Sequence, residues 1–425
     1  MNSLVTIAPE SKEQERYTNP LSITSQFFFC GLPLRLDSYR GCAFQCSFCY
    51  ARYRGGNSPN PNILPADPNT LRRTFDRAFR ADPLPAMIGQ FLRHRAPIHF
   101  GGMSDPFQPV ERRFGVTRRF LETLRDFSYP TVISTRSTEA SAEPFLALLQ
   151  EMPFVVVQFS FVSTRQSVSW RLQPHSPSPK RLLASMEKLA RRGLPVTCRW
   201  QPYVPGLSEP PSEFARRVSD AGASHIALEH LKLPVEKGHP LWPVLTSGAG
   251  MDLDAYYRSA GARLDGRERV LPATAKLPAI LAARSAAHDH GLSFGVADNE
   301  FQYLSDYGCC CSGVDRFPGF DGWFKHQFAH AVRLCRGARV VYGSIARYWS
   351  PFGSVNRWMN SHSRIENGKR SGMLTEHIRT RWNEPASRLG PGSFYGIEPT
   401  DEFTPSGFRV YQWNETGRKI LKLLE

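Results

Sequence analysis

Three cysteines with a chemically telling spacing lie near the N-terminus. Cys42, Cys46 and Cys49 form a C-x3-C-x2-C triplet, and the aromatic residue Phe48 directly precedes the last of them. Thiolates spaced this closely can bind one small inorganic centre together, and a [4Fe–4S] cluster takes one cysteine per iron. Three cysteines without a fourth leave one iron open to a non-protein ligand, which favours an enzyme.

Structural zinc is the alternative interpretation of the triplet. A zinc site needs four ligands, commonly in two pairs separated by roughly 12–20 residues. No second pair follows at that spacing, and His94 is the only His or Cys between Ala51 and Arg95. The sequence therefore favours an iron–sulfur centre over zinc.

The stretch YRGCAFQCSFCYAR resembles the radical S-adenosylmethionine (SAM) superfamily, and within it the spore photoproduct lyase-like branch of DNA repair photolyase type. Further segments follow in the order of that branch: GGMSDPFQPVE from Gly101, STRS from Ser134, PHSPSPKRL from Pro174 and QPYVPGL from Gln201. The resemblance covers roughly residues 35–300 and is specific at the cysteines.

This resemblance implies a reaction and a set of cofactors. SAM would chelate the open iron through its amino and carboxylate groups. Reduction of the cluster, by a donor such as flavodoxin or ferredoxin, would then cleave SAM into methionine and a 5′-deoxyadenosyl radical. The resemblance also implies that backbone oxygens of Gly101 and Gly102 take the SAM amino group and that Phe48 contacts the adenine. A plain turn at the end of a strand is the alternative for the two glycines.

Two more residues are candidates for binding SAM. Arg136, at the end of a predicted strand, could pair bidentately with the SAM carboxylate, or could be a surface charge. Ser160 is a hydroxyl in an apolar strand and needs a partner, either SAM or a neighbouring carbonyl. Asp105, Gln108 and Glu111 follow the glycines in the same loop and are weaker candidates for substrate contact.

A second cysteine group, Cys309, Cys310 and Cys311, follows a predicted strand by about a dozen residues. It could bind a second Fe–S cluster, with Cys335 as the fourth ligand, or be a set of buried thiols. It could also include a thiol that returns a hydrogen atom to a substrate radical. Cys310 and Cys198 are the candidates for that catalytic role.

The composition suits an anionic partner. The 425 residues carry a net charge of +15 and a pI near 9.6, so DNA or RNA is the leading candidate, with a solvated basic surface as the alternative. In the C-terminal region, Arg347, Arg357, Arg364, Lys369 and Arg370 lie among aromatic residues, which suits base stacking or a core equally. No membrane segment or signal peptide is expected, and the clustered cysteines indicate a reducing cytoplasm.

Short β-branched runs alternate with amphipathic stretches along most of the chain. Strands are predicted at residues 98–100, 131–134, 154–161, 195–203, 224–233 and 292–297, and helices at 117–127, 180–192 and 277–290. This rhythm predicts an α/β fold, and the resemblance implies a partial (β/α)6-type TIM barrel whose reactive loops follow the strands. The predicted domains are a lead-in at 1–30, the barrel at 31–315 and a C-terminal module at 316–425, which begins with a helical stretch over 317–334.

The leading hypothesis is a radical SAM enzyme acting on a nucleic acid or nucleotide. Two alternatives stay open. One is a radical SAM enzyme acting on a peptide or small molecule, and the other is a non-catalytic nucleic-acid-binding protein whose cysteines hold a metal or a structural cluster.

Overall fold

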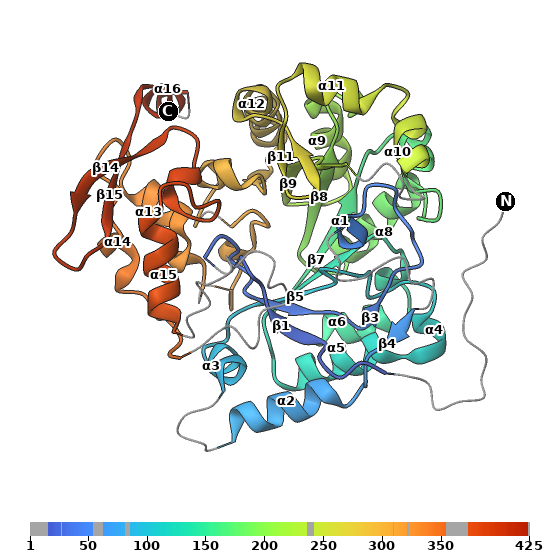
Figure 1. Ribbon diagram of the computed structural model, residues 1–425. Coiled ribbons are helices and arrows are strands. Elements are labelled where there is room, and N and C mark those ends of the chain that lie inside the picture. The colour runs from blue at the N-terminus through green and yellow to red at the C-terminus, as the bar shows by residue number, and fades with distance from the viewer. Residues whose placement is uncertain are drawn as a thin grey trace. The chain divides into compact units, whose positions relative to one another are not determined.

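The computed structural model describes residues 16–26, 28–53, 63–80, 86–235, 242–308, 310–320, 323–353 and 373–423. The chain forms two compact units that alternate along the sequence (Figure 1). The first comprises residues 1–21, 36–73 and 99–294, and the second comprises residues 22–35, 74–98 and 295–425.

An eight-stranded sheet is the main β structure, with the strand order β1-β2-β5-β6-β7-β8-β9-β13. Its strands are β1 (Leu21–Ile23), β2 (Leu34–Leu36), β5 (Ile98–Phe100), β6 (Thr131–Thr135), β7 (Val155–Phe161), β8 (Val196–Tyr203), β9 (His225–His230) and β13 (Ser293–Val296). The pairs β6–β7, β7–β8 and β8–β9 are parallel. The sheet is open, because β1 and β13 are edges. The predicted α/β class with a partial barrel is therefore confirmed, with two strands more than the six that the resemblance implied.

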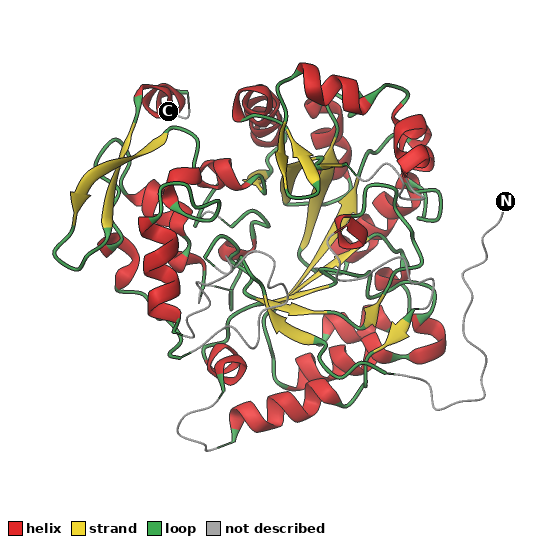
Figure 2. Cartoon of the chain, in the orientation of Figure 1, coloured by secondary structure: helices red, strands yellow, loops and turns green. Residues whose placement is uncertain are grey.

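Helices alternate with these strands, as Figure 2 shows. In the first unit they are α1 (Tyr50–Tyr53), α4 (Glu111–Phe114), α5 (Val116–Asp126), α6 (Phe145–Gln150), α7 (Gln166–Leu172), α8 (Pro179–Arg191), α9 (Pro211–Asp220), α10 (Trp242–Ala249), α11 (Leu253–Ser259) and α12 (Ala273–Asp289). α8 illustrates why they form. The Ser178 hydroxyl caps the N-terminus, Pro179 starts the first turn, and Leu182, Met186 and Leu189 are buried on one face.

The two faces of the sheet differ in chemistry. Phe161 of β7 and Trp200 of β8 both contact Phe214 of α9, with the Trp200 ring stacked on Phe214 at 4.0 Å. Because side chains alternate along a strand, their neighbours Ser160 and Arg199 lie on the opposite face, here called the inner face. The inner face is largely polar, and this is where the sheet positions candidate functional groups.

Smaller sheets complete the β structure. They are β10-β12-β11, β14–β15 and β3–β4. Their strands are β3 (Tyr39–Arg40), β4 (Leu64–Pro65), β10 (Leu233–Pro234), β11 (Arg263–Asp265), β12 (Glu268–Val270), β14 (Ile397–Phe403) and β15 (Arg409–Trp413).

The core of the second unit is rich in aromatic residues. The ring of Phe328 stacks on Phe28 at 5.2 Å and meets Trp382 edge-on at 5.1 Å. The unit's helices are α3 (Met87–Arg93), α13 (Phe328–Leu334), α14 (Gly343–Ala346), α15 (Leu374–Asn383) and α16 (Glu415–Lys422). α2 (Thr70–Phe79) crosses the division between the units.

The helix predicted over 317–334 is wrong in extent. Only a short 3-10 turn, Phe324–His326, and α13 form there among the described residues. Pro318 lacks a backbone N–H, and Gly319 adopts a positive φ of 83°, so the chain turns instead of continuing a helix.

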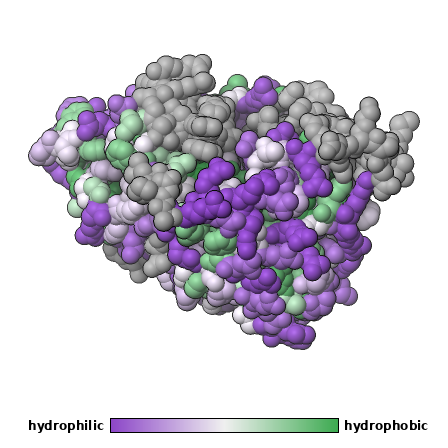
Figure 3. All heavy atoms as spheres, turned by 90° about the horizontal axis from the view of Figure 1, so that it is seen from below, coloured by the Kyte–Doolittle hydropathy of each residue, from purple (hydrophilic) through white to green (hydrophobic). Residues whose placement is uncertain are grey.

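Two properties concern the surface. On the face drawn in Figure 3, most of the coloured surface is hydrophilic and the hydrophobic patches are separate. None of the helices in the described part of the chain combines the length and apolar character that crossing a bilayer requires.

Candidate iron–sulfur and SAM site

The cysteine loop, residues 41–49, lies between β3 and α1. The chain turns sharply within it, because Gly41 and Gln45 both have positive φ, at 95° and 46°. The N–H of Cys49 donates to the carbonyl of Cys46 at 3.2 Å. These turns fold the three cysteines of the triplet into one compact segment.

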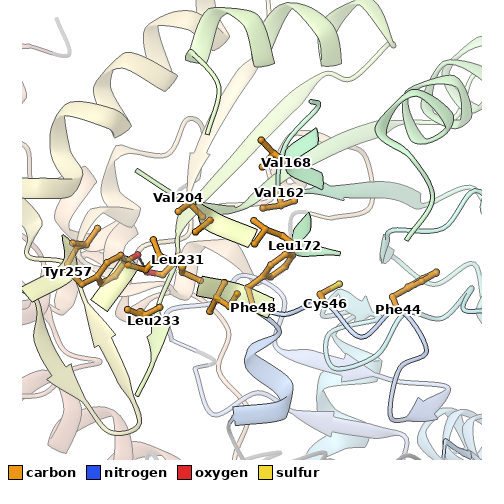
Figure 4. Packing of buried hydrophobic residues seen from close by; sticks show 14 residues of the cluster. Phe44, Cys46, Phe48, Val162, Val168, Leu172, Val204, Leu231, Leu233 and Tyr257 are labelled. Atoms are coloured by element: carbon orange, nitrogen blue, oxygen red, sulfur yellow. Dashed lines mark hydrogen bonds between the residues drawn. The ribbon is translucent and has the colours of Figure 1, made fainter. Parts of the chain in front are cut away.

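The cysteine loop packs into an apolar cluster. Phe44, Cys46 and Phe48 are buried in it together with Leu172 of α7 (Figure 4). Cys42 and Cys49 are partly buried and pack against this cluster. Burial raises the pKa of the Cys42 thiol well above its ordinary value, and the nearby Asp105 carboxylate raises it further. The thiolate form of Cys42 therefore needs a positive centre beside it, as a metal–sulfur cluster provides.

Gln108 holds the cysteine loop from the far end of the loop that follows β5. Its side chain is fully buried, its Oε1 accepts from the N–H of Ala43 at 2.9 Å, and its Nε2 donates to the carbonyl of Gly41 at 3.1 Å. On the other side, the N–H and hydroxyl of Ser47 both donate to the carbonyl of Leu172, at 3.0 and 2.9 Å. The backbone around the cysteines is thus fixed by protein contacts alone.

The glycine segment after β5 lies against this loop. Gly101 has a φ of 92°, and a Cβ there would lie 2.6 Å from the carbonyl oxygen of Ser134, so only glycine fits. The hydroxyl of Tyr50, the residue after Cys49, donates to the carbonyl of Gly102. That carbonyl keeps a second lone pair for an amino group such as that of SAM.

Arg136 connects three strand ends to the cysteine loop. Its guanidinium donates to the carbonyl of Ser160 at 3.2 Å, to the carbonyl of Gln201 at 2.8 Å and to Oε1 of Gln173 at 2.7 Å. The same group lies 5.1 Å from the ring centroid of Phe48. Within the part of the chain that the structure describes, Arg136 uses three of its five N–H donors, which leaves two for an anionic ligand. It is therefore not a surface charge.

Asp105 fixes the backbone at Arg136. It is buried, and its carboxylate accepts from the N–H of Arg136 at 2.6 Å, the N–H of Phe107 at 2.9 Å and the hydroxyl of Thr135 at 2.9 Å. Burial raises the pKa of Asp105 to about 6, although these hydrogen bonds and Arg136 oppose the shift. Asp105 is thus ionised at neutral pH and fixes the backbone at the end of β6.

Glu111 is also a supporting residue. It is buried and accepts from the Tyr39 hydroxyl and from the N–H groups of Thr117 and Arg118, at 2.9 and 3.0 Å. Asp105, Gln108 and Glu111 were the weaker candidates for substrate contact. The structure instead gives each of them protein partners around the cysteine loop.

Ser160 lies on the inner face close to Arg136. Its carbonyl accepts from Arg136, while its hydroxyl has no hydrogen-bond partner among the described residues. The alternative of a neighbouring carbonyl partner is therefore not realised within that part of the chain. The hydroxyl stays available to a ligand.

Cys198, a candidate hydrogen-atom donor, lies elsewhere. It is fully buried in β8, two residues before Trp200, and so faces the helix α9 rather than the inner face. Burial raises the pKa of its thiol well above the ordinary value. The structure does not bring Cys198 onto the face that carries Ser160 and Arg199.

Cys310, the second candidate donor, belongs to the second unit. It is buried, and its Sγ lies 2.9 Å from the hydroxyl of Ser312. Burial first, and then Asp315, Cys311 and Cys30, raise the pKa of Cys310 well above its ordinary value. The fold therefore brings Cys30 near this group, a neighbour that spacing could not suggest. Cys309 lies outside the described residues.

The described residues contain no group of three or more His, Cys, Asp or Glu side chains arranged around a single metal ion. A [4Fe–4S] cluster makes a different demand, because it takes one thiolate on each iron and not several on one ion. The cysteine loop fits that demand in its donor chemistry: three thiols on one segment, held by backbone hydrogen bonds in an apolar setting.

Sequence reasoning missed the role of Gln108 as a partner of the cysteine loop, and it missed the residues that orient Arg136. Gln108 clamps Ala43 from 65 positions away, and Gln173 and Gln201 orient the Arg136 guanidinium. Gln173 directly precedes the segment PHSPSPKRL, and Gln201 begins QPYVPGL. Their places beside these segments were the only available signal.

No family model matches the sequence. It is similar to two curated proteins, the uncharacterized protein Rv2578c of Mycobacterium tuberculosis and the uncharacterized protein Mb2609c of Mycobacterium bovis, each 24% identical over 216 residues. The match covers 48% of this chain and 60% of each relative, so it spans about three fifths of their length.

Two solved structures are also similar. A variant of spore photoproduct lyase, with AdoMet and a dinucleoside spore photoproduct bound, has a TM-score of 0.46 and 13% identity over 61% of this chain and 75% of its own. Streptococcus suis SuiB bound to S-adenosylmethionine has a TM-score of 0.35 and 13% identity over 48% of this chain and 42% of its own. The first carries the name of the branch whose motifs the sequence resembles. These likenesses concern the fold, and the function is argued from the residues of this chain.

Proposed function

We propose that this protein is a radical SAM enzyme. Cys42, Cys46 and Cys49 would each bind one iron of a [4Fe–4S] cluster, and the fourth iron would bind SAM. Such a cluster supplies the electron that splits SAM reductively to a 5′-deoxyadenosyl radical. One observation carries the proposal: Phe48 of the cysteine loop lies against Arg136, and Tyr50, directly after that loop, donates to Gly102, beside the carboxyl ends of β6, β7 and β8.

The chain's own residues would bind and orient SAM. The two free N–H donors of Arg136 suit the SAM carboxylate, because a guanidinium fork matches a carboxylate bidentately. The second lone pair of the Gly102 carbonyl suits the amino group, the Ser160 hydroxyl suits the ribose, and Phe48 suits the adenine. Asp105 would keep Arg136 in place through its backbone N–H.

The apolar cluster around the cysteine loop would exclude water. Phe44, Phe48 and Leu172 are buried beside the thiols, so a reactive species formed there would be shielded from solvent.

For the substrate, we propose a nucleic acid or a nucleotide. The net charge of +15 supports it. In the second unit, the cations of Lys325 and Arg347 lie 5.7 and 5.2 Å from the ring centroid of Tyr348, and Trp349 stacks on His94 at 3.8 Å. Arg357, Trp358, Arg364, Lys369 and Arg370 lie outside the described residues. A peptide or small-molecule substrate is the alternative.

The decisive experiment is anaerobic reconstitution with iron and sulfide, followed by reduction in the presence of SAM. The expected result is about four irons per chain and formation of 5′-deoxyadenosine. Near eight irons would indicate a second cluster. A chain that binds no iron, or binds it without cleaving SAM, would refute the enzyme proposal in favour of a nucleic-acid-binding protein. Binding to DNA and RNA across a salt series tests the substrate class separately, since phosphate-driven binding weakens steeply with salt.

A further inference from the structure

Four residues of adjacent strands form one row on the inner face. Ser160 of β7 is in register with Arg199 of β8, and Arg199 is in register with Ala227 of β9. On the other side, Arg136 follows the last residue of β6 and donates to the carbonyl of Ser160. Two guanidinium groups therefore flank one serine in a single row.

The row beneath it is closed by hydrogen bonds. Ser134, on β6, lies 2.7 Å from Nε2 of His99 and donates to Oε1 of Gln158 at 3.3 Å, while Nε2 of Gln158 donates to the hydroxyl of Thr197 at 3.2 Å. All four of these residues are buried. Each of these four side chains thus has a hydrogen-bond partner on a neighbouring strand, although Nδ1 of His99 is buried without a partner among the described residues.

Arg199 makes fewer hydrogen bonds than Arg136. Its only hydrogen bond is a long one, from Nη1 to Oε1 of Gln158 at 3.5 Å, and its Nε is buried without a partner among the described residues. Arg136, in the same row, has three shorter bonds and a ring contact. A guanidinium whose buried N–H lacks a partner is costly, because its desolvation is not compensated.

The neighbours of Arg199 in its row have small side chains. Ser160 on one side and Ala227 on the other are among the smallest side chains, and the Ser160 hydroxyl has no partner in the described part of the chain. A guanidinium whose Nε–H has no partner among the described residues is a donor that suits an oxyanion.

We propose that Arg199 binds an oxyanion group of the molecule on which the enzyme acts. The inference rests on the proposed function, because it places this anion beside the SAM site. Arg136 takes the SAM carboxylate, so the anion at Arg199 is a phosphate or carboxylate of the substrate. In this row, Arg136 thus binds the cosubstrate SAM and Arg199 binds the substrate.

The test compares the anaerobically purified full-length chain with its Arg199→Gln variant. Arg216→Gln is the matched control, because Arg216 is exposed on α9 and its side chain pairs with the exposed Asp220 of the same helix. Calorimetric titration measures four probes: SAM, decarboxylated SAM, a thymidine dinucleotide and its uncharged methylphosphonate analogue. The midpoint of thermal unfolding is measured alongside.

Arg199→Gln is expected to weaken binding of the charged dinucleotide by ~10–100-fold, as expected for loss of a charge-assisted hydrogen bond. Binding of the uncharged analogue should stay the same. The unfolding midpoint should not fall, because the residue removed makes one long hydrogen bond. Loss of affinity for SAM, but not for decarboxylated SAM, would overturn the inference, because the ligand of Arg199 would then be the SAM carboxylate and not a group of the substrate.

Charged probes that bind equally well to both chains, or to neither, would overturn the inference. A lowered unfolding midpoint with unchanged binding would overturn it too, since Arg199 would then be structural. Iron content and SAM cleavage of the unaltered chain are measured separately. If Arg199 binds an anion in a chain that cannot cleave SAM, the proposed function is refuted while the anion site is supported.

Discussion

Gln108 offers a sharp test of how the protein holds its cysteines. Its amide makes two hydrogen bonds to the backbone of the cysteine loop, at 2.9 Å to Ala43 and 3.1 Å to Gly41, and the side chain is fully buried. Gln108→Leu keeps similar volume and removes both bonds. A typical intramolecular hydrogen bond contributes about 0.5–1.5 kcal/mol, so the loop should lose about 1–3 kcal/mol of stability.

The lost stability should make the cysteine loop open more often. Since 1.4 kcal/mol corresponds to a factor of ten, a loss of about 2 kcal/mol makes opening of the cysteine loop roughly 30-fold more frequent. A cluster held by that loop should lose iron correspondingly faster. The assay is anaerobic iron release to a chelator, followed by absorbance, with Gln150→Leu as the control because Gln150 is exposed at the end of α6.

The reasoning fails if the Gln108→Leu variant folds and releases iron at the rate of the unaltered chain. In that case the three thiols and the metal would hold the loop in place, and the two hydrogen bonds from Gln108 to the loop backbone would not matter for it. Circular dichroism of the variant establishes folding before the release is measured.

Three further predictions concern single side chains. Cys46→Ala should abolish SAM cleavage and leave the unfolding midpoint within a few degrees of that of the unaltered chain. Cys335→Ala, the control, should still cleave SAM. Turnover by the Cys46→Ala variant would contradict the cluster assignment. Arg136→Lys should raise the dissociation constant for SAM about 10-fold, because an ammonium cannot reproduce the guanidinium fork. Arg112→Lys, at an exposed ion pair, should leave that constant unchanged. Equal SAM affinities of the Arg136→Lys variant and the unaltered chain would reject the role of Arg136. His326 is buried, and burial first and His94 second lower its pKa to about 4. Because the folded protein favours the neutral imidazole, the stability that His326 contributes is complete above pH 6.5 and is lost as the pH falls to about 4. His326→Phe should reduce that acid-induced loss by about 3 kcal/mol in urea unfolding, and an identical pH profile would refute the shift.

Much of the fold could be predicted because it is encoded locally. The strand predicted at 98–100 matches β5, and those predicted at 131–134 and 154–161 differ from β6 and β7 by one residue at one end. Runs of β-branched residues and amphipathic helical stretches are visible within a dozen residues. The helix over 317–334 was overextended because a proline and a glycine interrupt its apolar pattern.

The candidate site could be predicted only in part. Cysteine spacing singled out the loop, strand ends singled out Gly101 and Arg136, and a hydroxyl within an apolar run singled out Ser160, because each signal lies within a short segment. The partners of these residues could not be foreseen. Gln108 and Ala43 are 65 positions apart, and Arg136 and Gln201 are also 65 apart. Periodicity left the face of Cys198 undecided, and contact with α9 decided it.

The amino-acid sequence by itself determined the three thiols, their spacing and the alternation of strands and helices, since these depend on neighbours along the chain. Only the tertiary structure decided that Arg199 stands in register with Ser160 while its Nε–H stays unpaired, and that Arg136 reaches across two strands to the cysteine loop. The physical reason is that strand register and hydrogen-bond satisfaction arise between segments far apart in the chain.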